Sequence, residues 1–236
     1  MRAYGCSGRS KINMSLYIIA TPIGNLEDIS ARAVRILGEV DILLCEDTRT
    51  TGKLLKHYDI KVKTMSYHAH SNDSRENEII ELLREGKEVA LVSDAGTPTI
   101  SDPGVKLVER VKTELPEVMV SPIPGASALM SALSVSGISS ARFTFLGFLP
   151  HKKGRQTLFA EIAESRETMV FYESTHRIMK TLESLSEIIP DRHIAVAREL
   201  TKIYEQVKTG TVNDVRKYFL ENEDKVRGEF VVIVAP

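Results

Sequence analysis

The sequence has little of several features that would place it in a class at once. Only two cysteines occur among 236 residues, Cys6 and Cys45. They suggest no disulfide framework, and no cluster of cysteine and histidine has the spacing of a zinc site, so we expect no metal. Charges nearly cancel, with 31 Lys and Arg against 32 Asp and Glu and a net charge of −1. Any contact with nucleic acid must therefore come from a local basic patch.

Long apolar segments are also missing. No apolar run approaches the roughly 18 residues that a membrane-spanning helix requires, so we expect no contact with a membrane. Residues 1–14 carry charge but lack the apolar centre of a secretory signal. We interpret them as a disordered leader, with Met14 near the functional beginning of the chain, and a cytoplasmic location is the default expectation.

Two motifs that cradle phosphates in nucleotide-binding proteins do not occur. The pattern G-x-G-x-x-G is absent after the first expected strand, and the pattern G-x-x-x-x-G-K-[ST] is absent as well. Their absence argues against an enzyme that uses a dinucleotide or a nucleoside triphosphate.

Strand and helix patterns alternate from Leu16 onward in a chain of ordinary globular composition. Five strands separated by helices up to Ser121 predict a mostly parallel, doubly wound sheet. After a stretch rich in Ser, Ala, Gly and Pro at residues 122–140, further strands and helices follow. Two closely spaced strand patterns, Ile194–Ala197 and Ile203–Thr209, predict an antiparallel pair in a mixed sheet. We therefore predict two α/β domains, residues 15–121 and 122–236.

Loops rich in Gly, Pro, Ser, Thr and Asp follow three of the expected strands. Residues 93–104 follow the apolar run Val89–Val92, and neither that strand nor the next helix can continue through them. The other two loops are residues 20–26 and 122–128. Open α/β sheets bind ligands at the carboxyl ends of their strands, so the three loops predict one shared cleft.

The loop of residues 93–104 has two interpretations, ligand binding and helix capping, and each fits a different part of it. Gly96 and Gly104 permit close approach of the backbone to a ligand, and Asp94 and Asp102 offer acceptors for ribose hydroxyls or backbone N–H groups. Asp102 and Pro103 fit the N-cap and first position of the following helix. We expect ligand contact from Asp94–Thr97 and helix initiation from Asp102 and Pro103.

Polar residues end the next two strands along the chain. Glu46, Asp47 and Arg49 follow the second strand, and His68 follows the third. Side chains of these types can orient a hydroxyl nucleophile and accept its proton. A surface ion pair with solvated histidines is the alternative.

A basic loop lies in the second predicted domain. Phe148 is followed closely by Lys152, Lys153 and Arg155, and this combination suits the phosphates and unpaired bases of RNA. A merely solvated loop is the alternative. Polar residues also gather at later strand ends, at Tyr172–Arg177 and at Arg198–Lys202, where an interface ion-pair network competes with a functional role for the second group.

Together, five blocks in this order make the sequence resemble the S-adenosylmethionine-dependent methyltransferases named for the tetrapyrrole methylases. Within that class they resemble the 16S rRNA cytidine 2′-O-ribose methyltransferases, the RsmI family. The blocks are residues 20–26, 46–49, 93–98, 171–177 and 198–202. The resemblance covers about residues 16–234, and only the combination is specific.

The resemblance implies a class III methyltransferase with two α/β domains, S-adenosylmethionine in a cleft between them, and a homodimer. It implies a cytidine in the decoding region of 16S rRNA, in the small ribosomal subunit, as the substrate. Cofactor-binding residues are then expected at Pro22, Gly24, Asp94, Ala95, Gly96, Thr97, Pro124, Gly125, Ala126, Ser127, Ala128, Phe171 and Tyr172.

A ribose hydroxyl attacking a methyl group needs alignment and removal of its proton. Our catalytic candidates are Glu46, Asp47, Arg49 and His68, with Glu173 and Lys202 behind them, and the RNA-binding candidates are Lys152, Lys153, Arg155, His176 and Arg177. Two alternatives stay open. One is a methyltransferase for a tetrapyrrole or another small molecule on the same scaffold, and the other is a non-catalytic module that binds RNA or the ribosome.

Overall fold

The computed structural model describes residues 14–69, 71 and 73–236, and their contacts divide the chain into two compact units. Unit 1 holds residues 14–21 and Asp28–Gly125, and unit 2 holds Pro22–Glu27 and Ala126–Pro236. The expected leader and Cys6 fall outside the described residues, apart from Met14. The division after Gly125 lies later than the expected one because the fifth strand pairs with the first as far as Ile123.

Unit 1 is a doubly wound, all-parallel sheet of five strands in the order β3-β2-β4-β1-β5, as the alternating pattern predicts. Its strands are β1 Ser15–Ile19, β2 Ile42–Cys45, β3 Lys63–Ser66, β4 Val89–Val92 and β5 Met119–Ile123. Its helices are α1 Ala31–Glu39, α2 Thr48–His57, α3 Asp73–Arg84 and α4 Val105–Glu114, and a short 3-10 turn, Leu26–Asp28, precedes α1 at the border with unit 2.

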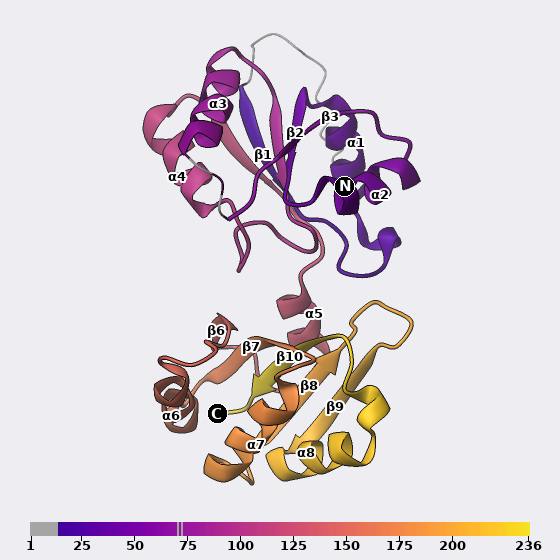
Figure 1. Ribbon diagram of the computed structural model, residues 1–236, viewed down its shortest axis with the longest axis vertical. Helices are drawn as coiled ribbons and strands as arrows, with labels where there is room; N and C mark the ends of the chain where they lie inside the picture. Colours follow the sequence, from indigo (N-terminus) through magenta and orange to yellow (C-terminus); the bar gives the residue numbers. More distant parts are fainter. Residues whose placement is uncertain (1–13, 70, 72) are drawn as a thin grey trace. The chain divides into compact units, whose positions relative to one another are not determined.

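Two apolar layers hold unit 1 together, one on each face of the sheet. Ile42 and Leu44 of β2 pack with α3 and α4, whereas Leu43 and Cys45 pack with α1 and α2. Figure 1 shows these helix pairs on opposite sides of the strands. Because successive side chains of a strand point to opposite faces, a strand covered on both sides must be apolar throughout, and β2 and β4 are buried along their whole length.

The start of α4 corrects one prediction. Asp102 is not its N-cap and Pro103 is not its first residue, because the helix begins at Val105. Gly104 occupies the cap position with φ 125°, and a Cβ there would lie 2.6 Å from Leu91 Cδ2. Close packing on β4 thus requires glycine at the cap position. The Asp102 carboxyl therefore does not cap the helix.

Unit 2 is a mixed sheet in the order β6-β7-β10-β8-β9, in which only β6 and β7 run parallel. The predicted antiparallel pair is confirmed as β8 with β9. The strands are β6 Phe143–Phe148, β7 Thr168–Ser174, β8 His193–Arg198, β9 Gln206–Thr211 and β10 Glu229–Val234. The helices are α5 Ala128–Val135, α6 Arg155–Glu164, α7 Ile178–Ile188 and α8 Val212–Glu221, with a 3-10 turn at Glu223–Lys225.

The two faces of this second sheet are covered differently. Helices α6, α7 and α8 pack on one face, and α5 packs with Ile23 on the other (Figure 1). Phe171 lies in the first layer and Tyr172 in the second. Among the described residues, no helix has both the length and the apolarity to cross a membrane.

Candidate functional site

Three loops meet where β1, β4 and β5 end in unit 1. Thr21 and Gly96 exchange backbone hydrogen bonds of 2.8 and 3.0 Å, and the Thr21 hydroxyl donates to the Ser93 carbonyl at 3.2 Å. A Cβ on Gly125 would stand 3.0 Å from Ala20 Cβ, so the third loop lies directly against the first. The sequence predicts that these loops share a site, and within unit 1 their ends are in contact.

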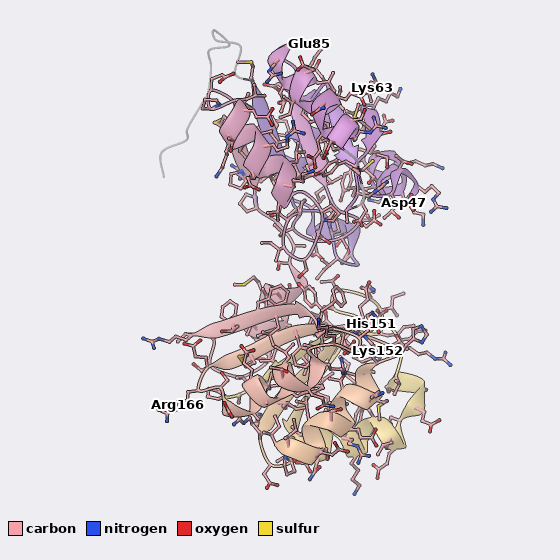
Figure 2. All side chains as sticks on the ribbon, turned by 60° about the vertical axis from the view of Figure 1, so that its left-hand side comes forward. Asp47, Lys63, Glu85, His151, Lys152 and Arg166 are labelled. Atoms are coloured by element: carbon pink, nitrogen blue, oxygen red, sulfur yellow. The ribbon has the colours of Figure 1, made fainter. Side chains whose placement is uncertain are left out.

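Carboxylates from β2 and β4 meet beside these loops. The Asp47 backbone N–H donates to Asp94 Oδ1 at 3.0 Å, which links the ends of the two strands. Asp47 caps α2 by accepting from the Arg49 backbone at 2.8 Å, and the Arg49 guanidinium lies 2.7 Å from its carboxylate. Hydrogen bonds from the Arg49 side chain and backbone lower the pKa of Asp47 to about 2. Figure 2 shows Asp47 at the end of unit 1 away from Glu85.

Two further carboxyls of this site hold protons more tightly than usual. Burial raises the pKa of Asp102 to about 6, against a hydrogen bond from Ser93, and nearby Glu46 and Asp94 raise it further. Burial and the Asp94 charge also raise the pKa of Glu46, while His68 lowers it. Sequence reasoning assigned Asp102 to the start of α4 and not to ligand contact, and so left it out of this acidic site (Glu46, Asp47, Asp94 and Asp102). Its position in the same loop as Asp94 is the signal that was available.

The charge of the acidic site limits what it can bind. Its four carboxyl groups outnumber the basic groups that the described residues place beside them, the exposed Arg49 guanidinium and the His68 ring. Such a site attracts a cation and accepts hydrogen bonds from hydroxyls, but it repels a phosphate. Within the described residues, no group of three or more His, Cys, Asp or Glu side chains is arranged to hold a metal ion.

The remaining unit 1 candidate, His68, is exposed on the turn after β3, where its backbone N–H donates to Ser71 Oγ at 2.9 Å. It lies close enough to Glu46 to affect the pKa of that carboxyl. Its place at this edge of the sheet is compatible with the predicted role, which stays a prediction.

Lys202 and Gly24 come together in unit 2. A Cβ on Gly24 would lie 2.4 Å from Lys202 Cγ, so only glycine lets the two loops approach this closely. Lys202 Nζ lies 2.9 Å from both Glu199 Oε1 and Glu229 Oε2. Burial opposes the charge, yet the two carboxylates raise the pKa of Lys202, so the ammonium cannot accept a proton at neutral pH.

Glu173 lies inside unit 2 rather than at a surface. Its side chain is completely buried and pairs with Arg177 Nε at 2.8 Å and with Arg155 Nη2 at 3.8 Å. A group enclosed in this way cannot touch a substrate in this structure, so the geometry favours a structural role. The same holds for Arg155, which is 8% exposed and packs over the Phe159 ring.

Arg177 is only 17% exposed because it pairs with Glu173, whereas the other three basic candidates remain accessible. Lys152, Lys153 and His176 are exposed, and Figure 2 shows His151 and Lys152 near the end of β6, at the other end of the sheet from Arg166. Phe148 is 58% exposed and stacks edge-to-face on Tyr172 with ring centroids 5.4 Å apart.

Two of the expected cofactor residues, Phe171 and Tyr172, lie on opposite faces of strand β7. Phe171 is fully buried under the helices, whereas Tyr172 faces α5 and its hydroxyl accepts from the Leu129 backbone at 3.2 Å. Since neighbouring residues of a strand face opposite ways, only Tyr172 remains a candidate for contact with a ligand. Ser127 serves as the N-cap of α5, and Pro124, Ala126 and Ala128 flank that start.

Comparisons with known proteins agree on one family. The model of the tetrapyrrole (corrin/porphyrin) methylases matches residues 15–216. Ribosomal RNA small subunit methyltransferase I of Haemophilus influenzae is 46% identical over 93% of this chain and 77% of its own, and the Thermotoga maritima protein of the same name is 45% identical over 93% and 97%. The crystal structure of cobalt precorrin-4 methyltransferase matches 98% of both chains with a TM-score of 0.67 at 18% identity, which supports the fold. The chain therefore belongs to the tetrapyrrole methylase family, and within it to the group of the ribosomal RNA small subunit methyltransferases I.

Proposed function

We propose that this protein transfers the methyl group of S-adenosylmethionine to the ribose 2′-hydroxyl of a cytidine in the decoding region of 16S rRNA. The observation that carries the proposal is the 46% identity, over 93% of the chain, to an enzyme named as a methyltransferase of small subunit ribosomal RNA. The cofactor is S-adenosylmethionine, because the chain belongs to a family of methylases that use it.

The acidic site of unit 1 fits such a cofactor. S-adenosylmethionine supplies an electrophilic methyl group on a positively charged sulfur and carries ribose hydroxyls but no phosphate. We propose that Asp94–Thr97 hold its ribose and methionine parts, since Asp94 is exposed and Gly96 is anchored to Thr21 by two backbone bonds. The proposal includes Pro22, Gly24, Pro124–Ala128 and Tyr172 as further contacts, and the predicted cleft between the domains stays a prediction.

The residues that handle the hydroxyl proton are proposed from the same site. A carboxylate acts best as a general base when its pKa lies near the working pH, which favours Asp102, at about 6, and Glu46. Asp47 is held ionised by Arg49 and is a weaker base, so we assign this pair to orienting the Asp94 side of the site. His68 stays a candidate for positioning Glu46.

RNA contact is proposed for the exposed part of the loop between β6 and α6. Lys152 and Lys153 would meet phosphates, His176 would lie on the same side at the end of β7, and the exposed Phe148 ring would stack on an unpaired base. This arrangement places positive charge in unit 2, while the acidic site of unit 1 repels phosphate.

Replacing both lysines tests that assignment. The Lys152→Ala, Lys153→Ala variant is expected to bind small-subunit rRNA about 10-fold more weakly in 0.1 M salt and to lose roughly 1.4 from the slope of log affinity against log salt, because each phosphate contact with a single strand contributes about 0.7. Filter binding across a salt series measures both. Lys63→Ala, an exposed lysine near the Glu85 end of unit 1 (Figure 2), is the control. An unchanged slope in the double variant would remove the loop from the RNA site.

A methyl-transfer assay with radiolabelled cofactor separates the candidate functions. Label is expected in the RNA of small ribosomal subunits or of naked 16S rRNA, and none in tetrapyrroles. Label in a tetrapyrrole alone would support the small-molecule alternative. Cofactor binding without transfer to any of these acceptors would support the non-catalytic module.

We further propose that the protein is a homodimer that works in the cytoplasm, where ribosomal subunits are assembled. Light scattering after gel filtration is expected to give twice the 26.3 kDa of one chain. A mass of one chain at micromolar concentration would refute the dimer.

A further inference from the structure

A buried group of charged residues lies under the base of the basic loop in unit 2. Glu173 is paired with Arg177 and Arg155, and its Oε2 also accepts from the Thr181 hydroxyl at 2.7 Å. Arg155 Nη2 donates to the same hydroxyl at 2.7 Å. We call Glu173, Arg155, Arg177 and Thr181 the buried charge cluster.

Both guanidinium groups of the cluster also donate hydrogen bonds to the backbone of the loop. Arg177 Nη1 donates to the Leu149 carbonyl at 2.6 Å, and Arg155 Nη1 donates to the Pro150 carbonyl at 3.3 Å. Leu149 and Pro150 are the two residues directly before the exposed segment His151–Gly154. The far end of that segment is fixed too, because the Arg155 N–H donates to the Lys152 carbonyl at 3.2 Å as α6 begins.

Stability alone does not explain such a cluster. Burying charged groups costs desolvation, and apolar residues of similar size often hold a core at least as well. What a guanidinium adds is a rigid planar set of donors that can bond a carboxylate and a carbonyl at once. Here the bonded carbonyls belong to consecutive residues at one end of the basic segment, so the cluster fixes where that segment leaves the sheet.

We propose that Glu173, with Arg155 and Arg177, is a positioning residue that holds Lys152 and Lys153 in the orientation that binds the phosphates of rRNA. This rests on the proposed function. Glu173 orients the two guanidinium groups, and they in turn hold the Leu149 and Pro150 carbonyls. The carboxylate offsets one of the two guanidinium charges, so its loss leaves two like charges side by side and releases the loop.

The test is a double-mutant cycle between the cluster and the lysines. The variants are Glu173→Gln, the Lys152→Ala, Lys153→Ala variant and the combination of all three. The readouts are the Kd for naked 16S rRNA, the Kd for S-adenosylmethionine and amide hydrogen exchange over residues 149–155, which include the Arg155 N–H bonded to the Lys152 carbonyl. Glu173→Gln is expected to weaken rRNA binding about 5-fold, to change cofactor binding less than 2-fold, and to speed exchange in the loop at least 10-fold. The triple variant is expected to bind rRNA no more weakly than the lysine variant.

Two results would overturn the proposal. One is unchanged exchange in the loop of Glu173→Gln, and the other is a loss of rRNA affinity that multiplies with that of the lysine variant. If the lysine variant alone binds normally, the RNA site fails, and the exchange readout still decides whether the cluster holds the loop.

A second variant and a matched control distinguish the loss of loop positioning from a general loss of folding. Arg177→Lys keeps the charge beside Glu173 but lacks the second nitrogen that reaches Leu149, so it is expected to shift affinity and exchange in the same direction; wild-type values for both would contradict the proposal. Glu76→Gln removes an equally buried glutamate of unit 1, which pairs with Lys106 at 3.1 Å and Arg110 at 3.2 Å. It is expected to leave loop exchange unchanged, and faster exchange there would mean that any loss of a buried charge loosens the loop.

Discussion

Asp102→Asn is expected to lose most methyl transfer, at least about 100-fold in kcat, and at the same time to make the protein more stable. The loss follows from removing a carboxylate proposed to accept the hydroxyl proton. The gain follows from burial, because the folded protein holds Asp102 with a pKa of about 6 instead of 3.8. Asparagine keeps an oxygen that can accept the hydrogen bond from Ser93.

The sign of the pH dependence is fixed by the direction of that shift. A carboxyl with a raised pKa binds an extra proton in the folded state, so its contribution to stability is present below about pH 3.8 and is lost as the pH rises through about 6. Above pH 6 the variant should therefore gain about 1–2 kcal/mol, less than the roughly 3 kcal/mol of the full shift because the group is only half-buried. Urea unfolding at pH 5 and pH 8, together with kcat from pH 5 to 9, measures both effects.

Asp73→Asn is the matched control, since Asp73 is exposed and its pKa is lowered by Lys106. It should lose a little stability at neutral pH and keep full activity. Wild-type activity in Asp102→Asn would assign the proton to Glu46 or to another group.

Asp94→Ala is expected to weaken binding of S-adenosylmethionine about 30-fold. A charge-assisted hydrogen bond is worth about 1.5–3 kcal/mol, and Asp94 also holds the end of β2 through the Asp47 backbone N–H at 3.0 Å. Calorimetric titration with S-adenosylmethionine and with its uncharged thioether product measures the effect.

Asp94→Asn separates charge from anchoring. Its amide oxygen can still accept from Asp47, so the loop keeps its shape while one negative charge is removed. We expect this variant to lose affinity for the cofactor but to bind the neutral product as wild type does. Equal losses for both ligands would show that Asp94 acts through loop geometry, and no loss for either would remove it from the cofactor site.

Sequence patterns were sufficient for most of the fold because its strands and helices carry strong local signals. Apolar runs such as Val89–Val92 are covered on both faces, and the parallel sheet of unit 1 is confirmed. Helix α5 escaped the prediction because its Ser- and Ala-rich sequence has little periodic apolar contrast. The predicted start of α4 was wrong because the true start depends on the packing of Gly104 against Leu91, a contact that no local pattern reveals.

The parts of the candidate site that lie at strand ends could be predicted from the sequence. The exposure of a side chain could not, because it depends on partners far away in the chain. Loop contacts such as Thr21 with Gly96 follow from the parallel order of β1 and β4. Glu173 and Arg155 have the residue types of a catalytic or RNA-binding site, yet their long-range partners enclose them. Conversely, the local cap signal at Asp102 concealed a carboxyl that the fold places beside Glu46 and Asp94.

The most direct test of the proposed reaction is the chemical position of the new methyl group. After incubation of small ribosomal subunits or naked 16S rRNA with labelled cofactor and enzyme, one part of the RNA is digested to nucleosides for mass spectrometry. The other part is cut into defined fragments, and the decoding-region fragment is hydrolysed with alkali. We predict label in 2′-O-methylcytidine from the decoding region, in a dinucleotide that resists alkaline hydrolysis. Label on a base, which leaves the RNA sensitive to alkali, or label on the ribose of a different nucleoside would contradict the proposal.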